Sequence, residues 1–227
     1  MLAKKKSGYF GAAAFVGALA FAAQSVAQDA APDKFQAYLS GKAYNDLVLE
    51  VMRGLPADIF TRCPGLQFPP GKTFITQPVT FGANGLPTAG MWTSSLPVTG
   101  CGKDTVINLM FGVSKTDGKI KTLVLAPGTT ATSMVLQRDA FRYVADAFKS
   151  RAKDCDDTPM VINTRFESFG VKNPPTPDPG PAAGPKRPWW ETWTLKGCGR
   201  IMDVPVNFAP DATGTNIAVP LKDIKDR

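Results

Sequence analysis

Gly197-Cys198-Gly199-Arg200, near the end of the printed sequence, repeats Gly100-Cys101-Gly102-Lys103 at an interval of 97 residues. The match continues without a gap on both sides, and Trp92 and Trp189 stand at the same interval upstream of the glycines. The matched apolar residues occupy alternate positions, which is the period of a half-buried strand. The sequence therefore predicts an internal duplication.

Each copy contains signals for one helix followed by four short strands. Apolar residues recur at three- and four-residue steps from Met134 to Phe148 behind Ser133, which is typical of a capped amphipathic helix. The corresponding stretch, Phe35 to Arg53, is interrupted by Ser40-Gly41. We expect an α+β fold in two repeats, residues 28–127 and 128–227, in each of which a helix covers one face of a four-stranded antiparallel meander.

Four cysteines form an even set that lacks the Cys-x-x-Cys spacing of redox proteins: Cys63, Cys101, Cys155 and Cys198. Three pairings are possible. Cys63–Cys101 and Cys155–Cys198 enclose similar lengths of chain and occupy the same place in each copy, so we expect disulfides within the repeats. The flanking glycines fit a bulge or a tight bend.

Residues 1–27 have the three parts of a secretory signal peptide. Lys4-Lys5-Lys6 is followed by an apolar run from Tyr9 to Ala23 and by the small-residue exit Ser25-Val26-Ala27. An uncleaved anchor is the alternative, but the run is shorter than the roughly 20 apolar residues of a spanning helix. We expect cleavage after Ala27, a periplasmic or secreted protein, and no stable membrane insertion after cleavage.

Composition excludes several classes of function. The absence of histidine removes Ser-His-Asp and Cys-His catalysis and histidine-ligated metals. After cleavage, 23 basic and 19 acidic side chains would remain, too small an excess to predict nucleic-acid binding. Asp154, Asp156 and Asp157 are expected to form a solvated turn rather than a calcium site. No nucleotide fingerprint is present, and we expect neither a metal nor a cofactor.

The copies differ most at residues 173–188, where the second copy is rich in proline. Such a composition is incompatible with a central strand or a helix, and it predicts an extended arm. The arm is either a spacer or a docking segment that loses little entropy on binding.

Trp189-Trp190-Glu191-Thr192-Trp193 is the most distinctive local composition. Alternation directs Trp189 and Trp193 to one face, where they match core positions of the first copy, and Trp190 to the other. Trp190, with Lys186, Arg187 and Glu191 beside it, is the candidate binding site, where the indole stacks on a sugar ring or anchors a protein. Alternatively, Trp190 covers the other sheet face or packs under the proline-rich arm.

Trp189-Trp190-Glu191-Thr192-Trp193-Thr194, leading into Gly197-Cys198-Gly199, resembles uncharacterised secreted bacterial proteins with a Trp…Gly-Cys-Gly β module, a resemblance that implies no activity. At the level of architecture, the tandem helix-plus-four-strand unit with one disulfide per unit is similar to cystatin-like proteins and to secreted β-lactamase inhibitor proteins. Fold-level similarity does not carry function.

Two functions of different class remain. The first is an exported, non-enzymatic binding protein that holds a protein or glycan of the bacterial cell envelope. The alternative is a histidine-independent periplasmic hydrolase that uses carboxylates or a serine. Ser150-Arg151-Ala152-Lys153 satisfies a Ser-x-x-Lys pattern, but Ser150 falls at the end of a predicted helix rather than at its start, so we assign no catalytic residue.

Overall fold

The computed structural model describes residues 30–102, 104–170 and 187–227. This part of the chain forms an α+β fold, as expected, with two antiparallel sheets, three α-helices and two disulfide bonds. The elements follow in the order α1 (Ala30–Leu39), α2 (Lys42–Arg53), β1 (Lys72–Phe81), β2 (Pro87–Val98), β3 (Thr105–Val113), β4 (Ile120–Val124), α3 (Met134–Arg151), β5 (Met160–Phe169), β6 (Trp189–Gly197), β7 (Arg200–Pro210), β8 (Thr215–Ala218), the 3₁₀ turn η1 (Leu221–Asp223) and β9 (Lys225–Asp226).

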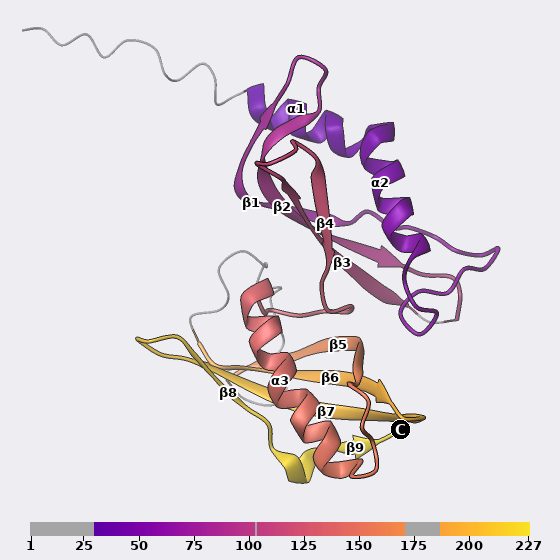
Figure 1. The fold of residues 1–227 in the computed structure, drawn as a ribbon, viewed down its shortest axis with the longest axis vertical. Helices are drawn as coiled ribbons and strands as arrows, with labels where there is room; N and C mark the ends of the chain where they lie inside the picture. Colours follow the sequence, from indigo (N-terminus) through magenta and orange to yellow (C-terminus); the bar gives the residue numbers. More distant parts are fainter. Residues whose placement is uncertain (1–29, 103, 171–186) are drawn as a thin grey trace, which may run out of the picture.

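The first sheet has the strand order β1-β2-β3-β4, and each neighbouring pair is antiparallel. α1 and α2 lie along one face of this sheet (Figure 1). Between the helices and the sheet, the fully buried rings of Trp92 and Phe111 stack with their centroids 5.4 Å apart. The Tyr44 hydroxyl of α2 donates a hydrogen bond to Ser94 Oγ at 2.8 Å. The alternating apolar residues of β2 and β3 thus face the helices.

Two helices cover this sheet, where the sequence predicts one interrupted helix. Gly41 is the N-cap of α2 and has an extended backbone, so the helical hydrogen-bond pattern stops and restarts there. A Cβ at Gly41 would lie 3.1 Å from the Tyr38 carbonyl oxygen, a tight contact. The Ser40-Gly41 signal therefore marks a true helix boundary.

The second sheet has five strands, one more than expected. β5-β6-β7-β8 form the predicted meander, and β9 pairs with β7 on the return of the chain from η1. α3 covers one face of this sheet (Figure 1), and Ser133 caps it by accepting a hydrogen bond from the Leu136 backbone N–H. The helix predicted from Met134 onward is thereby confirmed.

The disulfides pair as the sequence predicts: Cys63 with Cys101, and Cys155 with Cys198. The second bond attaches to the β6–β7 hairpin, whose two-residue turn consists of Cys198 and Gly199. Both turn residues have positive φ, 47° and 74°. This is the type I′ geometry that follows the twist of antiparallel strands, and it explains the glycine after the cysteine.

Residues 97 positions apart take corresponding places in the two sheets. Trp189 of β6 pairs in register with Phe208 of β7, and the two rings stack with their centroids 4.7 Å apart. Trp92 and Phe111 pair in register and stack in the same way between β2 and β3. The tryptophan and the phenylalanine of one sheet therefore lie 97 residues from the tryptophan and the phenylalanine of the other, and they are paired in the same register.

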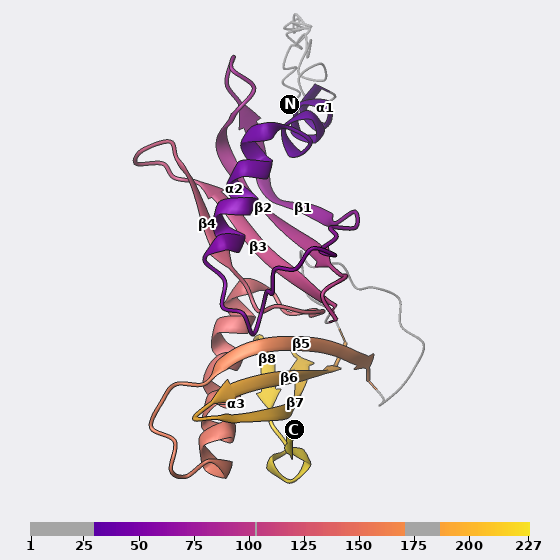
Figure 2. The same cartoon turned by 90° about the vertical axis from the view of Figure 1, so that its right-hand side faces the viewer.

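A short segment joins the two units, which lie one above the other along the long axis (Figure 2). Gly128 forms a parallel bridge to Thr164 of β5, and the Thr164 N–H donates to the Pro127 carbonyl at 2.6 Å. An ion pair of 2.7 Å between Lys196 and Asp58 also connects the units. The predicted boundary between the two repeats, at residues 127 and 128, stays a prediction, because the backbone at this boundary itself pairs with a strand of the second sheet.

Several predictions concern residues outside the described part. They are the signal peptide at residues 1–27, Lys186, and all but the last two residues of the proline-rich stretch 173–188. Across the described ranges, no helix combines the length and the apolar character that crossing a membrane requires.

Candidate functional site

Alternation along β6 divides its side chains between two environments. Trp189, Glu191 and Trp193 point toward α3 and are almost completely buried. Trp190 and Thr192 point to the opposite, helix-free face and are half-buried. The prediction that Trp189 and Trp193 belong to the core is confirmed.

Glu191 accepts hydrogen bonds on both carboxylate oxygens. Oε1 accepts from Trp189 Nε1 at 3.0 Å and from the Ala131 backbone N–H at 2.8 Å, and Oε2 accepts from Trp193 Nε1 at 2.8 Å. Thr130 Oγ1 lies 3.0 and 2.9 Å from the two oxygens. Burial raises the pKa of Glu191, although these donors act in the opposite direction. The carboxylate joins β6 to the segment that leads into α3.

The structure therefore corrects the grouping of Glu191 with Trp190 at one surface. Neighbouring strand residues point to opposite faces, and the Glu191 side chain lies in the core. Arg187 is exposed, and its guanidinium lies over the Phe169 ring, 4.0 Å from the centroid. Of the four residues proposed from the sequence, Trp190 is the one that opens onto the helix-free face, and Lys186 falls outside the described residues.

Trp190 lines a hollow of about 400 Å³ on that face. We call this hollow and its lining side chains the Trp190 surface. It is built by β5, β6 and β7 together with the C-terminal segment of η1 and β9. Its lining includes Arg165, Glu167, Trp190, Thr192, Asp203, Pro205, Lys222, Asp223 and Lys225.

Hydrogen bonds hold several polar groups of the Trp190 surface in place. Glu167 Oε1 forms an ion pair of 2.6 Å with Arg165 and accepts a hydrogen bond from Thr192 at 2.6 Å. Asp203 accepts from Thr194 at 2.7 Å and from Arg227 at 2.9 Å. Glu191 also borders the hollow, but its side chain lies in the core; the other three acidic side chains and the three basic side chains of the lining balance in charge. The surface thus offers one large aromatic ring among fixed donors and acceptors.

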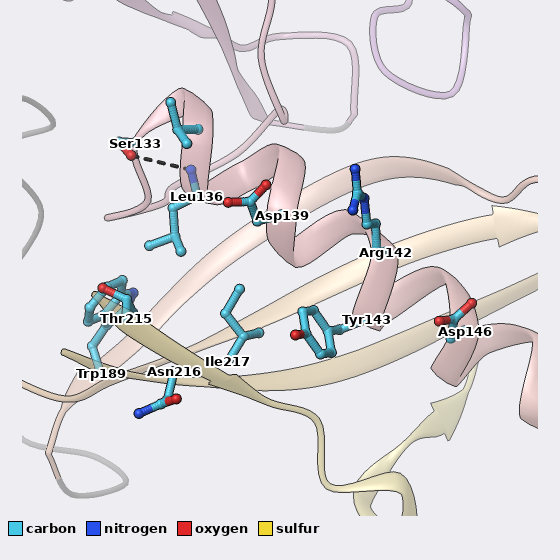
Figure 3. Close-up of a pocket in the computed structure, with 11 residues that line it drawn as sticks. Ser133, Leu136, Asp139, Arg142, Tyr143, Asp146, Trp189, Thr215, Asn216 and Ile217 are labelled. Atoms are coloured by element: carbon cyan, nitrogen blue, oxygen red, sulfur yellow. Dashed lines mark hydrogen bonds between the residues drawn. The ribbon is translucent and has the colours of Figure 1, made fainter. Parts of the chain in front are cut away.

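Two further concavities lie elsewhere. One, of about 650 Å³, runs between α3 and β8 (Figure 3). The other, of about 700 Å³, is mainly apolar and lies between the two units, where Ile59 and Leu123 of the first unit face Phe141 and Met160 of the second.

The residues considered for other chemistry have structural surroundings. Ser150 donates a hydrogen bond to the Ala147 carbonyl at 2.7 Å at the end of α3, and Ser133 caps the start of that helix. Within residues 30–102, 104–170 and 187–227, the structure shows no group of three or more cysteine or acidic side chains able to hold a metal ion.

No protein-family model matches the chain, and neither a curated protein nor a solved structure matches it significantly. The resemblance to secreted proteins with a Trp…Gly-Cys-Gly β module stays a prediction.

Most of the Trp190 surface was not predicted from the sequence. Polar residues at alternate positions of β5 and β7, such as Arg165, Glu167 and Asp203, carry a signal for the outer face of the sheet. No comparable local signal exists for Lys222 and Lys225, which reach this face only because the chain folds back after β8.

Proposed function

We propose that this protein is an exported, non-enzymatic binding protein that holds a saccharide of the bacterial cell envelope on the Trp190 surface. The observation that carries the proposal is the half-buried indole of Trp190 in a hollow whose charged lining includes an ion pair, Arg165–Glu167, that is already formed and hydrogen-bonded to Thr192. Of the two ligand classes considered, protein and glycan, this arrangement favours the glycan.

The chemistry of a sugar ring matches this surface. Its apolar C–H face packs on an indole, while its hydroxyl groups both donate and accept hydrogen bonds. Glu167 and Asp203 offer acceptors, and Arg165 offers donors. Because Glu167 is already fixed by Arg165 and Thr192, little side-chain entropy is lost when a ligand binds.

A periplasmic or secreted location is part of the same proposal. Two disulfides are compatible with a periplasmic or secreted protein, because disulfides persist in oxidising compartments. The signal peptide predicted at residues 1–27 is the segment that we propose directs export. We further propose that the two units arose by duplication, supported by the matching Trp–Phe pairs of the two sheets.

The test is co-sedimentation with purified peptidoglycan and affinity electrophoresis in gels containing soluble envelope polysaccharides. We expect wild-type protein to bind at least one of these glycans, and Trp190→Ala to bind it about tenfold more weakly or worse, because buried tryptophans at binding sites contribute about 2 kcal/mol or more. Tyr143→Ala is the matched control, since Tyr143 is an exposed aromatic side chain on α3.

An equal loss of binding in Trp190→Ala and Tyr143→Ala would contradict the assignment to this face. Failure of the wild-type protein to bind any of the glycans, combined with capture of an envelope protein that depends on Trp190, would replace the saccharide by a protein ligand. Thermal unfolding of both variants verifies that they are folded.

A further inference from the structure

A β-bulge in β5 brings Glu167 to the Trp190 surface. Trp190 pairs with Ser168 of β5, while the next residue of β6 pairs with Phe166. Glu167 is the extra residue between these two pairs. A bulge redirects a side chain and bends its strand, and β5 is curved (Figure 2). The Glu167 side chain lines the same hollow as the Trp190 indole and is 28% exposed, so a ligand in the hollow can reach it.

One carboxylate oxygen of Glu167 receives all of its contacts from other side chains. Oε1 accepts a hydrogen bond from Arg165 Nε at 2.9 Å and one from Thr192 Oγ1 at 2.6 Å, and it forms the 2.6 Å ion pair with Arg165 Nη2. Within the described residues, no hydrogen bond or ion pair reaches Glu167 Oε2 or Arg165 Nη1. The carboxylate is therefore held through Oε1, while Oε2 is an acceptor for a ligand.

Asp203 lies in the same hollow, but both of its oxygens have protein donors. Oδ1 accepts from Thr194 Oγ1 at 2.7 Å, and Oδ2 accepts from Arg227 Nε at 2.9 Å. Glu167 differs because its three contacts converge on one oxygen. Since the protein already fixes the Glu167 side chain, binding of a ligand at Oε2 costs little side-chain entropy.

We propose that Glu167 selects saccharides with a vicinal diol, which is a pair of free hydroxyl groups on adjacent carbons, at the edge of the ring that packs on Trp190. One hydroxyl donates a hydrogen bond to Glu167 Oε2, and its neighbour accepts one from Arg165 Nη1. This inference rests on the proposed function, because it names the class of sugar that the Trp190 surface holds.

The chemistry of the Arg165–Glu167 pair requires a ligand that supplies both a donor and an acceptor. A carboxylate only accepts and a guanidinium only donates, whereas a hydroxyl group does either. Two adjacent hydroxyl groups therefore satisfy both partners from one ring. In a polymer of N-acetylglucosamine, an acetamido group replaces one hydroxyl of the pair. The Arg165–Glu167 pair is thus expected to favour sugars that are unsubstituted at two adjacent carbons.

The test is affinity electrophoresis in gels that contain dextran, mannan or glycol chitin. Dextran presents trans diols and mannan presents cis diols, while glycol chitin is a soluble polymer of N-acetylglucosamine. We expect dextran or mannan to retard the wild-type protein and glycol chitin to leave its mobility unchanged. Periodate cleaves the carbon–carbon bond of a vicinal diol, so the retarding polysaccharide is expected to lose its effect after periodate oxidation and borohydride reduction.

Substitution at Glu167 tests the role of its carboxylate. Glu167→Gln keeps the size of the side chain and is expected to bind the retarding polysaccharide about tenfold more weakly, because a hydrogen bond to a charged group is lost. Thr192→Val removes a donor that positions Oε1 and is expected to have a smaller effect, which disappears when Glu167→Gln is already present. Glu50→Gln, the same change at an exposed site on α2, is the matched control and is expected to leave binding unchanged. Thermal unfolding verifies that the variants are folded.

The outcomes separate this inference from the proposed function. Trp190-dependent binding of glycol chitin that equals or exceeds binding of dextran and mannan would overturn the diol inference and leave the saccharide function standing. The same holds if binding survives periodate treatment, or if Glu167→Gln binds dextran or mannan as tightly as wild type does. If the wild-type protein binds no glycan in either the gels or the sedimentation assay, the proposed function fails and this inference fails with it.

Discussion

At the scale of single residues, Glu191 joins two indole rings to the segment that precedes α3. Its carboxylate accepts from Trp189, Trp193, Ala131 and Thr130, and the side chain is fully buried. The indole and backbone N–H groups can only donate, so each of them would be left without a partner if the carboxylate were removed. Replacing Glu191 is therefore expected to change the stability of the fold more than it changes ligand binding at the Trp190 surface.

The raised pKa of Glu191 predicts a pH dependence of stability. A carboxyl group whose folded pKa lies above its unfolded value stabilises the fold fully below the unfolded pKa, near 4.3, and this contribution is lost as pH rises through the folded pKa. Glu191→Gln cannot ionise, so the difference in unfolding free energy between Glu191→Gln and wild type is expected to shift in favour of the variant as pH rises. Urea unfolding of both proteins from pH 4 to pH 8 measures this difference.

The difference in unfolding free energy between the variant and wild type, followed against pH, isolates the contribution of Glu191. Other carboxyl groups, whose pKa is lowered by folding, change stability with pH in the opposite direction. Hydrogen bonds from Ser114 and Lys121 hold the pKa of Asp117 at about 2, so its contribution to stability is fully present above its unfolded pKa and is lost as pH falls through the folded pKa. Asp117 is present in both proteins and cancels. A difference that does not change with pH, or changes in favour of wild type, would show that Glu191 ionises as readily in the fold as in the unfolded chain.

At the scale of elements, strands with a local alternating pattern could be predicted, and elements defined by distant contacts could not. β2, β3, β6 and β7 repeat an apolar residue at every second position, so their faces follow from sequence alone. β9 has two residues and exists because it meets β7 after the chain turns through η1. For the same reason, the sequence identified Trp190 but missed Lys222 and Lys225, which η1 and β9 bring to the Trp190 surface.

The disulfide of the second unit is expected to stabilise it strongly. Cys155 follows α3, and Cys198 lies in the β6–β7 turn, 43 residues further along the chain. In the chain-entropy model, opening a loop of this length costs about 4 kcal/mol. The double variant Cys155→Ala/Cys198→Ala is expected to lose several kcal/mol of unfolding free energy, measured by urea denaturation.

The equivalent change in the first unit, Cys63→Ala/Cys101→Ala, is the matched comparison, because its loop spans 38 residues. A loss below about 1 kcal/mol in both double variants would contradict the role of the disulfides as the covalent framework of the fold.

At the scale of the whole molecule, Gly128 lies in the segment that joins the two units and bridges to Thr164 of β5. It has φ of 98°, and a Cβ there would lie 2.0 Å from the Thr164 carbonyl oxygen. Gly128→Ala must therefore displace the segment that runs along β5. We expect the free energy of unfolding to fall by about 2 kcal/mol or more. The Lys196–Asp58 pair cannot compensate, because both side chains are 38% exposed and such pairs contribute at most about 1 kcal/mol.

Gly118→Ala is the control for this substitution, because Gly118 also has positive φ, 65°, but has open space where a Cβ would be. We expect Gly128→Ala to lower the melting temperature clearly more than Gly118→Ala, and small-angle scattering to detect any change in how the units are arranged. Equal effects of the two substitutions would mean that the junction tolerates a side chain.

The central claim is that Trp190 is the contact residue for a saccharide, and tryptophan fluorescence tests it most directly. Trp92, Trp189 and Trp193 are at most 1% exposed, so acrylamide quenching in the folded protein reports chiefly on Trp190. We predict that a glycan retained in the sedimentation or electrophoresis assay reduces the quenching of wild-type protein, and has no effect on the residual quenching of Trp190→Ala. Unchanged quenching of the wild-type protein at saturating glycan would contradict the claim.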